Sequence, residues 1–536
     1  MKFREILIQV NGRLLYDNED VLERDYSYAV ATDLMSNVML ENVDDSILIT
    51  SLVNPQVIRA SEMMNISSIL ITSGKPVTET MIELAQNRNI ALAGTEMPTF
   101  TVCGKLHNLG ITEGPTTADK KMINSIVLVE NRCKGCVHCV RECPTEAIRI
   151  RNLKAIVDPE RCIECGMCIK ICPYHAMRPE VDSLESFNMD KYDYTIAIPA
   201  SACLGQFGNV KSRNHLLTAI KQLGFDEVCE EAVGAEIISN ATRKKLLSGK
   251  AKFPLISSGC PSILKLIQIK FPNLIEHVLE YEPPAEIVAE LARNRMKKKY
   301  PEDKIGIFFI APCTSKISSI KMIDEAVYSD IDVMVAISDV YRQIVANLKK
   351  LKDEDVENLE SAGVAGLRWT TPGGEAIALG TDDFIAVDGI EEAIEIFEKI
   401  EDDKLDNLKF VEAEACVGGC LGGSLTVENI YSARANMKKI VDEAKEKYGS
   451  RYMNTSDDEE LLRRTTELEY RPVLQLDEDL NVALKKMEEM GKVLRELPGI
   501  DCGVCGAPTC RAFAEDVIRG TVSERDCLVG RKILKK

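Results

Sequence analysis

The chain lacks a net positive charge, a long apolar run and an apolar leader. Its 66 lysine and arginine residues face 84 aspartate and glutamate residues, and the formal net charge of −18 disfavours nucleic acid and anionic membranes as partners. Residues 305–312 form one of the longest apolar runs, which is well short of the roughly 18 residues that a membrane span needs. Glu5 interrupts the apolar residues near the N-terminus, so no signal peptide is expected. These absences predict a cytoplasmic protein.

Cysteine is the residue that this chain has in excess. At 536 residues the chain is too long for one hydrophobic core, and we expect about three to five domains. Sixteen of its 19 cysteines fall into spacings typical of metal ligands. Such spacings favour thiolate ligation over a framework of disulfides. They also indicate an oxygen-poor cytoplasm.

The strongest spacing is a repeat between residues 133 and 173. Each copy reads C-x2-C-x2-C-x3-C-P, the pattern of bacterial two-cluster ferredoxins, in which the fourth cysteine of each copy crosses to the other cluster. A zinc knuckle is the alternative, but it would not need two such sets in register with Cys-Pro. The expected ligands are Cys133, Cys136, Cys139 and Cys172 for cluster one, and Cys162, Cys165, Cys168 and Cys143 for cluster two.

Three further loops carry cysteines that we expect to meet. Cys260 lies in S-S-G-C-P, Cys313 and Lys316 lie in A-P-C-T-S-K, and Cys416 and Cys420 lie in E-A-E-A-C-V-G-G-C-L-G-G-S. The glycines of the third loop allow close approach of the backbone, and a separation of four residues lets two thiolates reach one centre. Four thiolates are the number that an iron–sulfur cubane takes. Two of the loops follow apolar strand runs, where α/β sheets place their sites.

In order and content these loops resemble the catalytic domain of [FeFe]-hydrogenases, whose motifs read T-S-C-C-P, M-P-C-x-x-K-x-x-E and E-x-M-A-C-x-x-G-C-x-G-G-G. With the ferredoxin-like repeat, the resemblance covers residues from about 128 to 430. It implies that the four loop cysteines hold a [4Fe–4S] cube, and that Cys420 also bridges to a two-iron subsite with CO, cyanide and dithiolate ligands. It further implies that Lys316 donates to a cyanide, that Pro199 lines the pocket, and that H₂ and protons are the substrates.

The chain departs from that family at the positions that handle protons. Gly259 stands where the family has its relay cysteine, Ala311 and Glu414 replace two methionines, and residues 234–243 lack the carboxylates of the family's proton exit. The glutamate that follows the family's lysine is also absent. Because fast turnover needs a proton donor within hydrogen-bond reach, we expect slow catalysis. The pattern is similar to a sensory type of hydrogenase. Glu414 could replace the relay, tune the cluster or only form an ion pair.

Two other functions stay open. The chain could be a non-catalytic iron–sulfur scaffold or redox switch that lacks the two-iron subsite, although Lys316 and the intact glycine loop favour the hydrogenase. An electron-bifurcating enzyme is disfavoured because no flavin-binding or dinucleotide-binding fingerprint is present. In either remaining case the partner would be a redox protein or a downstream signalling protein.

The N-terminal residues 1–112 predict a separate α/β unit, because short apolar runs alternate with helical periods. The stretches A-T-D-L-M-S-N-V, L-I-T-S-L-V-N-P-Q-V-I-R-A and I-T-S-G-K resemble the small regulatory domain called DRTGG. The resemblance implies a module that senses a ligand or docks a partner. Residues 434–495 are charged and helical in period, which fits a connector or a dimer-forming arm, and thus a possible homodimer.

A last cysteine group lies near the C-terminus. The spacing C-x2-C-x4-C-x16-C and the stretch C-G-A-P-T-C-R-A-F-A-E-D resemble the small [4Fe–4S] domain of corrinoid iron–sulfur proteins. Zinc is the alternative, since four cysteines also suit zinc. The distance in sequence from the ferredoxin-like repeat suggests a second electron port or a redox-sensing tip. The ligands would be Cys502, Cys505, Cys510 and Cys527.

Three cysteines are left over. We expect Cys103 in the core of the first domain and Cys229 as a small buried hydrophobic residue. Cys203 follows Pro199 closely, so a role at the pocket stays open. The sequence thus predicts a multidomain α/β protein with four [4Fe–4S] clusters. Its parts are residues 1–112 (DRTGG-like domain), 113–127 (linker), 128–182 (ferredoxin-like dicluster insert), 190–433 (hydrogenase-type catalytic α/β domain), 434–495 (helical connector) and 496–536 (small Fe–S domain).

Overall fold

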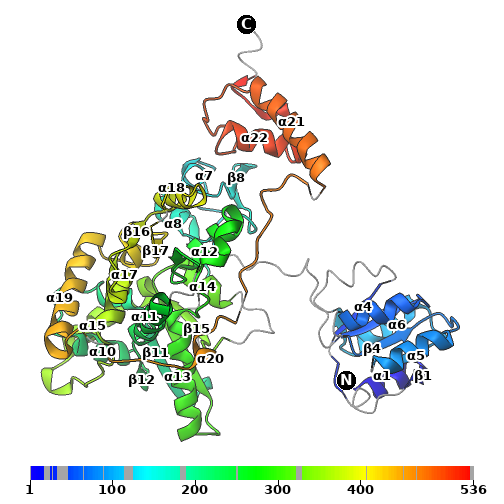
Figure 1. Ribbon diagram of the computed structural model, residues 1–536, viewed down its shortest axis with the longest axis horizontal. Helices are drawn as coiled ribbons and strands as arrows, with labels where there is room; N and C mark the ends of the chain where they lie inside the picture. The colour runs from blue at the N-terminus through cyan, green and yellow to red at the C-terminus, as the bar shows by residue number, and fades with distance from the viewer. Residues whose placement is uncertain are drawn as a thin grey trace. The chain divides into compact units, whose positions relative to one another are not determined.

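The computed structural model forms two compact units, residues 1–122 and 123–536, which are described one at a time (Figure 1). Most of the predicted linker, residues 114–124, lies outside the described residues. The described residues are 2–16, 24–26, 28–32, 46–63, 66–88, 90–113, 125–181, 189–248, 252–321, 329–405, 407–450, 452–465, 467–477 and 479–530.

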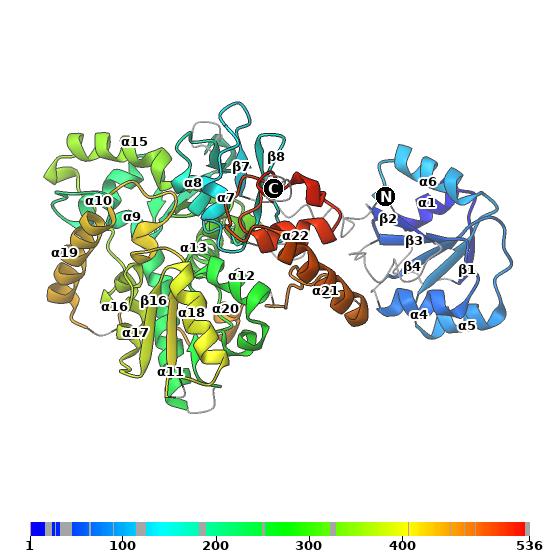
Figure 2. The same ribbon diagram turned by 90° about the horizontal axis from the view of Figure 1, so that it is seen from above.

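The N-terminal unit is a six-stranded sheet with helices on both faces, in the strand order β1-β5-β4-β3-β2-β6 (Figure 2). All neighbouring strands are parallel except β1, which runs antiparallel to β5. The short apolar runs of the sequence at residues 46–50, 69–72 and 90–93 fall on three strands of this sheet. Its elements are α1 (Phe3–Gln9), β1 (Arg13–Tyr16), β2 (Tyr28–Ala31), β3 (Ser46–Thr50), α4 (Pro55–Met63), β4 (Ser68–Ile71), α5 (Glu79–Asn87), β5 (Ala91–Gly94), α6 (Thr99–Asn108) and β6 (Thr112–Glu113).

Two cores hold this sheet between its helices. Residues of α1 and α6 pack with one face, and residues of α4 and α5 pack with the other. Cys103 packs at the edge of the first of these cores, as expected. Strands β1 to β5 each contribute to both cores because successive side chains of a β-strand point to opposite faces of the sheet.

The second unit begins with the cysteine-rich segment, which is built as a repeated hairpin and helix. Strand β7 (Ile126–Leu128) pairs antiparallel with β10 (Met177–Pro179), and β8 (Ile148–Arg151) pairs antiparallel with β9 (Lys154–Val157). Two short helices, α7 (His138–Arg141) and α8 (Met167–Ile171), lie between them in sequence. Cysteines make up much of the segment's core, so little apolar packing exists without them.

Two parallel sheets form the large α/β domain that follows. The four-stranded sheet has the order β12-β11-β14-β15, and the three-stranded sheet has the order β13-β17-β16. Because every pairing in them is parallel, the strands of each sheet end at the same edge. The strands are β11 (Tyr194–Pro199), β12 (Glu227–Val228), β13 (Leu255–Ile256), β14 (Ile305–Ala311), β15 (Val333–Ala336), β16 (Phe384–Asp388) and β17 (Phe410–Glu414).

Helices cover both faces of the four-stranded sheet. The central strand β14 is buried along its whole length and sends Phe308 and Ile310 to one face, and Ile307 and Phe309 to the other. The first face meets α10 (Arg213–Lys221), α15 (Ile337–Lys350) and α19 (Ile430–Tyr448), which lie together in both views (Figures 1 and 2). The second face meets α13 (Pro284–Lys299) and α14 (Thr314–Lys321). Burial on both faces explains the continuous apolar run in the sequence.

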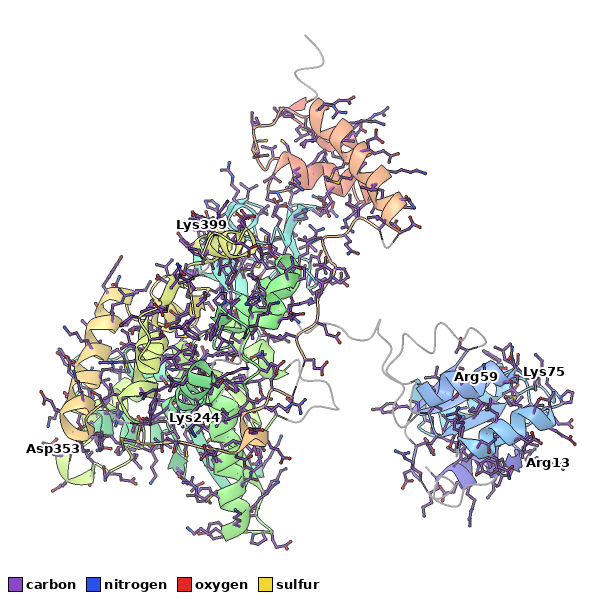
Figure 3. The ribbon with its side chains drawn as sticks, viewed as in Figure 1. Arg13, Arg59, Lys75, Lys244, Asp353 and Lys399 are labelled. Carbon is purple, nitrogen blue, oxygen red and sulfur yellow. The ribbon has the colours of Figure 1, made fainter. Side chains whose placement is uncertain are left out.

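The three-stranded sheet is covered by α12 (Pro261–Lys270) and α18 (Ile390–Glu401) on one face and by α17 (Gly374–Leu379) on the other. Exposed ion pairs lie on the surface of the unit, for example the pair between Lys399 and Glu395 at 2.6 Å (Figure 3). Such pairs add little to stability. The other helices are α9 (Ser201–Leu204), α11 (Glu231–Ser248), α16 (Val364–Leu367), α20 (Glu459–Leu462), α21 (Leu480–Glu496) and α22 (Cys510–Ile518).

The predicted connector, residues 434–495, is divided between two domains. Helix α19 packs on the four-stranded sheet through Ala433 and Met437. Helix α21 packs instead against α22 of the C-terminal domain. Between them only α20 is helical among the described residues. Leu480, Leu484 and Met487 of α21 are exposed, and the dimer-forming arm stays a prediction.

The cysteine-rich segment is held on the α/β domain by a buried ion pair. Glu164 accepts hydrogen bonds from the Ser125 backbone N–H at 2.8 Å and from the Ser125 hydroxyl at 3.0 Å. Its second oxygen pairs with the ammonium of Lys265 on α12. Both charged side chains are largely removed from solvent, so each depends on the other for compensation.

We expect Glu164→Ala to lower the free energy of unfolding by about 3 kcal/mol, because it leaves Lys265 without the buried Glu164 carboxylate. Adding Lys265→Met should restore most of that loss. The matched control is Glu395→Ala, which breaks an exposed pair and should cost less than about 1 kcal/mol. Calorimetric unfolding of the unmodified protein, the two single variants and the double variant measures these free-energy losses. Equal losses for Glu164→Ala and Glu395→Ala would show that the buried pair does not anchor the segment.

Candidate metal centre

A cavity between the ends of the two parallel sheets is lined by all four cysteines of the three predicted loops. Cys260 precedes α12 after β13, Cys313 follows β14, and Cys416 follows β17. Cys420 lies in a single 3-10 turn, η5 (Gly419–Gly422). The atom-free space of the cavity is about 860 Å³ including its open mouth.

The glycines of the third cysteine loop allow it to touch the second loop, which carries Cys313. Gly418 and Gly419 have φ values of 82° and 72°, a backbone conformation that side chains oppose. A Cβ at Gly423 would lie 2.3 Å from the carbonyl oxygen of Pro312, next to Cys313. Any larger residue there would push the two cysteine loops apart, so the expected close approach of backbone is present.

The four thiols are free and raise one another's pKa. Burial raises the pKa of Cys260 to about 11, and Cys313 adds to the shift. Burial also raises the pKa of Cys416 and Cys420 well above the usual value, and both feel the charges of Cys313 and Cys260. Four thiolates need a compensating cation in such a place. A polynuclear iron–sulfur group supplies that charge, so the donor set fits one.

A single metal ion would need its ligands to converge on one point, unlike a cubane. No three His, Cys, Asp or Glu side chains of the described residues are close enough together to hold one ion. In a cubane each of four cysteine thiolates binds a different iron atom. Its ligands therefore surround a volume and need not meet at a point.

Lys316 brings the nearest positive charge to this cavity. It stands in the first turn of α14, and its Nζ donates to Glu231 Oε1 at 2.5 Å. Glu231 in turn accepts the backbone N–H of Ser201 at 2.7 Å. Burial alone would lower the pKa of Lys316, but Glu231 and the thiols of Cys420 and Cys313 raise it above the usual value. The lysine therefore stays charged inside the protein.

Glu375, Glu412 and Glu414 also line the cavity. Of these three carboxyl groups, the sequence predicted a role only for Glu414. Glu412 accepts the backbone N–H groups of Gly373 and Ala376 at 2.9 Å each, and burial raises its pKa to about 7. Burial and the neighbouring carboxylates raise the pKa of Glu375 and Glu414 well above the usual value. These groups therefore favour the protonated form. No spacing in the sequence relates residue 375 to residue 412.

Glu375 and Glu414 each have one carboxyl oxygen, Oε1 and Oε2 respectively, without a hydrogen-bond partner among the described residues. The hydroxyl of Ser257 donates to Glu375 Oε2 at 2.5 Å. Glu414 Oε2 would lie 2.7 Å from a Cβ built at Gly419, which places this oxygen against the loop that carries Cys420.

Gly259 lies beneath a tryptophan ring. A Cβ at Gly259 would be 3.2 Å from Cζ3 of Trp369 and 3.3 Å from the Ser257 hydroxyl. The indole N–H of Trp369 donates to Ser239 at 2.7 Å, which holds the ring in place. Little room is left for a side chain at the position where the resembled family has its relay cysteine.

Pro199 and Ala311 are buried at the ends of β11 and β14, but neither is among the described residues that line the cavity. The wall beyond β11 is formed by Ser201 and Ala202 instead. Cys203 points into the core shared by α10 and α15, away from the cavity lining. The pocket role that the sequence left open for Cys203 therefore has no support in the geometry.

Cys229 is mostly buried, as expected, but it also has polar neighbours. Its sulfur lies 3.6 Å from Glu227 Oε1 and 3.6 Å from a guanidinium nitrogen of Arg295.

The cysteine-rich segment brings its ligands together in the crossed arrangement. The thiol of Cys139 has Cys136, Cys172 and Cys133 as its charged neighbours, and that of Cys168 has Cys165, Cys162 and Cys143. The crossing cysteines receive equivalent hydrogen bonds. The N–H of Ala147 donates to the sulfur of Cys143 at 3.2 Å, and that of Ala176 to the sulfur of Cys172 at 3.3 Å.

Predicted cluster two lies against the cavity. Cys165 is itself one of the lining residues. A Cβ at its neighbour Gly166 would be 2.4 Å from Ser424, and the Thr314 hydroxyl donates to the carbonyl of Glu164 at 2.7 Å. The ammonium of Lys170 donates to the carbonyl of Gly422. The loops of the two predicted cubes are therefore in direct contact.

The four C-terminal cysteines also come together. They line one small pocket with Leu497, Phe513 and Leu528. Burial raises the pKa of Cys505, and Cys527 and Cys502 are its charged neighbours. The backbone N–H of Gly530 donates to the sulfur of Cys527 at 3.4 Å.

Comparisons with known families agree with this division. Residues 193–382 and 378–424 match the family described as "Iron only hydrogenase large subunit, C-terminal domain". Residues 125–173 match the "4Fe-4S dicluster domain", residues 5–109 match the "DRTGG domain", and residues 497–529 match an Fe-S cluster family. These matches confirm the resemblances to the hydrogenase, dicluster and DRTGG domains, and they confirm an Fe-S domain at residues 497–529. The likeness of that last domain to corrinoid iron–sulfur proteins and the sensory type of the hydrogenase stay predictions.

Individual relatives are distant. The chain is 22% identical over 382 residues to the NADP-reducing hydrogenase subunit HndD of Solidesulfovibrio fructosivorans, a match that covers 60% of this chain and 61% of that protein. Among solved structures, the [FeFe]-hydrogenase HydA1 of Chlamydomonas reinhardtii is 15% identical, with a TM-score of 0.39 and coverage of 52% of this chain and 95% of the other. The CBS and DRTGG domains of a Clostridium perfringens pyrophosphatase are 19% identical, with a TM-score of 0.17 and coverage of 19% and 44%.

No helix in the described ranges has both the length and the apolar character needed to cross a membrane. The family matches and the thiol-lined cavity lead to one assignment. Residues 193–424 of this chain form a domain of the iron-only hydrogenase large-subunit type, preceded by a DRTGG domain and a 4Fe-4S dicluster domain and followed by a further Fe-S domain.

Proposed function

We propose that the protein slowly interconverts H₂ with two protons and two electrons, and that its role is to report H₂ or redox state. The observation that carries the proposal is the convergence of four cysteines from three loops on one cavity beside a charged, buried lysine. Cys260, Cys313, Cys416 and Cys420 would hold the cube, and Cys420 would also reach the two-iron subsite. When bound, that subsite supplies the iron chemistry that splits or forms H₂.

Lys316 would orient the inorganic group. Its ammonium has three donors, and Glu231 takes one of them. The remaining donors can face an anionic ligand, as a cyanide would be, in a cavity where water does not compete. Glu231 fixes the direction of the side chain and is itself fixed by Ser201.

Protons need a route that does not use a cysteine at residue 259. Glu414 lines the cavity and has an oxygen with no hydrogen-bond partner among the described residues. Glu375 and Glu412 line the same wall, and Ser257 donates to Glu375. We propose that Glu414 holds the transferable proton and that Glu375 and Glu412 extend the route. Burial raises the pKa of Glu414 well above its usual value, which favours a proton held at this carboxyl group.

Electrons would reach the cavity through predicted cluster two, because Cys165 lines the cavity wall. A redox partner protein or a downstream signalling protein would exchange them, and the N-terminal unit would sense a ligand or dock a partner. Association into a homodimer through α21 also remains a proposal, since its Leu480, Leu484 and Met487 are exposed.

A second function has one observation in its favour. Because Lys316 is already paired with Glu231, its burial is compensated without a cyanide. The protein could then hold four cubanes and act as a redox scaffold without the two-iron subsite. Infrared spectroscopy separates the two functions.

We expect the protein, after anaerobic maturation, to show infrared bands of bound CO and cyanide and to catalyse slow H₂ uptake and evolution. Cys420→Ala should abolish these bands, because it removes the bridge between cube and subsite. Cys103→Ser, a thiol of the N-terminal unit, is the matched control and should leave them unchanged. A protein with a full set of cubanes and no CO or cyanide bands would be the scaffold.

We expect Glu414→Gln to reduce the rates of H₂ oxidation and evolution by about 100-fold, the typical contribution of a positioned proton donor. The amide keeps the shape of the side chain but cannot pass a proton. Glu391→Gln, an exposed position on α18, is the control. Infrared bands must be equal in both variants, so that loading is not the cause. Unchanged rates in Glu414→Gln would exclude the relay and leave a tuning role.

A further inference from the structure

The C-terminal domain contacts the dicluster domain, although the two are far apart in sequence. The backbone N–H of Ile150, in β8, donates to the carbonyl of Gly506 at 2.8 Å. Gly506 has a φ of 85°, and a Cβ there would lie 2.2 Å from the carbonyl of Ile150. Only a glycine allows this approach, so the contact is built into the loop that holds Cys505 and Cys510.

Charged side chains fix the same contact. Arg149 Nε and Arg151 Nη2 both donate to Asp516 Oδ2, at 2.8 and 2.6 Å. Arg161 pairs with Glu515, the neighbouring residue on α22. Asp516 is 7% exposed and Arg161 is 6% exposed, so these pairs are largely removed from water. Breaking one buried partner is costly, which makes the interface specific in orientation.

The contact joins two cysteine loops. Gly503 lies between Cys502 and Cys505, and a Cβ on it would be 3.3 Å from Cγ1 of Val137. Val137 lies between Cys136 and Cys139, two of the predicted ligands of cluster one. In addition, the guanidinium of Arg151 donates to the carbonyl of Cys505 at 3.4 Å.

We infer that the C-terminal cluster is the outer member of one electron chain, which exchanges single electrons with cluster one, then cluster two, then the cavity. The inference rests on the proposed function for its inner end, where Cys165 lines the cavity wall. In H₂ oxidation the two protons leave to solvent, and the two electrons pass outward one at a time. Each transfer oxidises one cluster and reduces the next by one electron, and a one-electron carrier protein removes them.

The inference also corrects the expectation of a separate tip. The sequence placed the C-terminal cysteines at the far end from the ferredoxin-like repeat, whereas the two loops are in contact. The C-terminal cluster therefore extends the electron path of the ferredoxin-like repeat and does not form a second, separate electron port.

The test uses the full chain with its cubanes reconstituted, without the two-iron subsite, and reduced with dithionite. We expect electron paramagnetic resonance to show magnetic interaction between the C-terminal cluster and cluster one, as broadened, fast-relaxing signals. Asp516→Lys should remove this interaction at unchanged iron content, because it repels Arg149 and Arg151. Glu524→Lys makes the same charge change at an exposed site of the same domain and should leave the spectrum unchanged.

Hydrogen exchange gives a second readout that needs no cluster signal. The amide of Ile150 should exchange about tenfold faster or more in Asp516→Lys, as the loss of a buried ion pair allows, and not in Glu524→Lys. If Asp516→Lys does not fold, the double variant Arg149→Gln with Arg151→Gln opens the interface from the other side. Uncoupled signals in the unmodified protein would overturn the inference. Absent CO and cyanide bands would overturn only the proposed function.

Discussion

Four thiols must share one cavity of low polarity, and the rest of the catalytic domain follows from that constraint. Three parallel strands end at the cavity, so each delivers its cysteine loop to the same place. Mutual repulsion and burial oppose the thiolate form, and only a compensating cation makes it favourable. Gly423 lies where two of these loops pass within contact distance of each other, and Gly418 and Gly419 have positive φ values that let the third loop turn.

The dicluster domain is bound to the α/β domain by polar contacts more than by apolar ones. Glu164 joins Ser125 and Lys265, and Thr314 binds the carbonyl of the same glutamate. A small domain in whose core cysteines take several places has little apolar area to offer. Its orientation depends on directional bonds instead, which place Cys165 at the cavity wall. The contact with Asp516 on its other side is of the same kind.

Sequence reasoning recovered the features that are local in sequence. The crossed cysteine sets, the three loops, the two strands that precede Cys260 and Cys313, and Lys316 all depend on patterns within a few residues. The strand before Cys416 and the parallel direction of all three strands came from the structure. Sequence reasoning missed Glu231, Glu375 and Glu412, because tertiary packing alone brings these residues to the cavity. Pro199 was assigned to the pocket by resemblance, and it is buried at the end of β11, two residues before Ser201 of the cavity lining. The docking of the C-terminal domain was also missed, since no local pattern encodes an ion pair between residues 151 and 516.

The pairing of Lys316 with Glu231 has a consequence for biogenesis. The ammonium group of Lys316 is already paired with the Glu231 carboxylate. Burial raises the pKa of the Cys416 and Cys420 thiols, which favours their neutral forms. The cavity wall is therefore electrically balanced before any iron arrives. We therefore expect that the α/β domain can fold before the inorganic group is inserted.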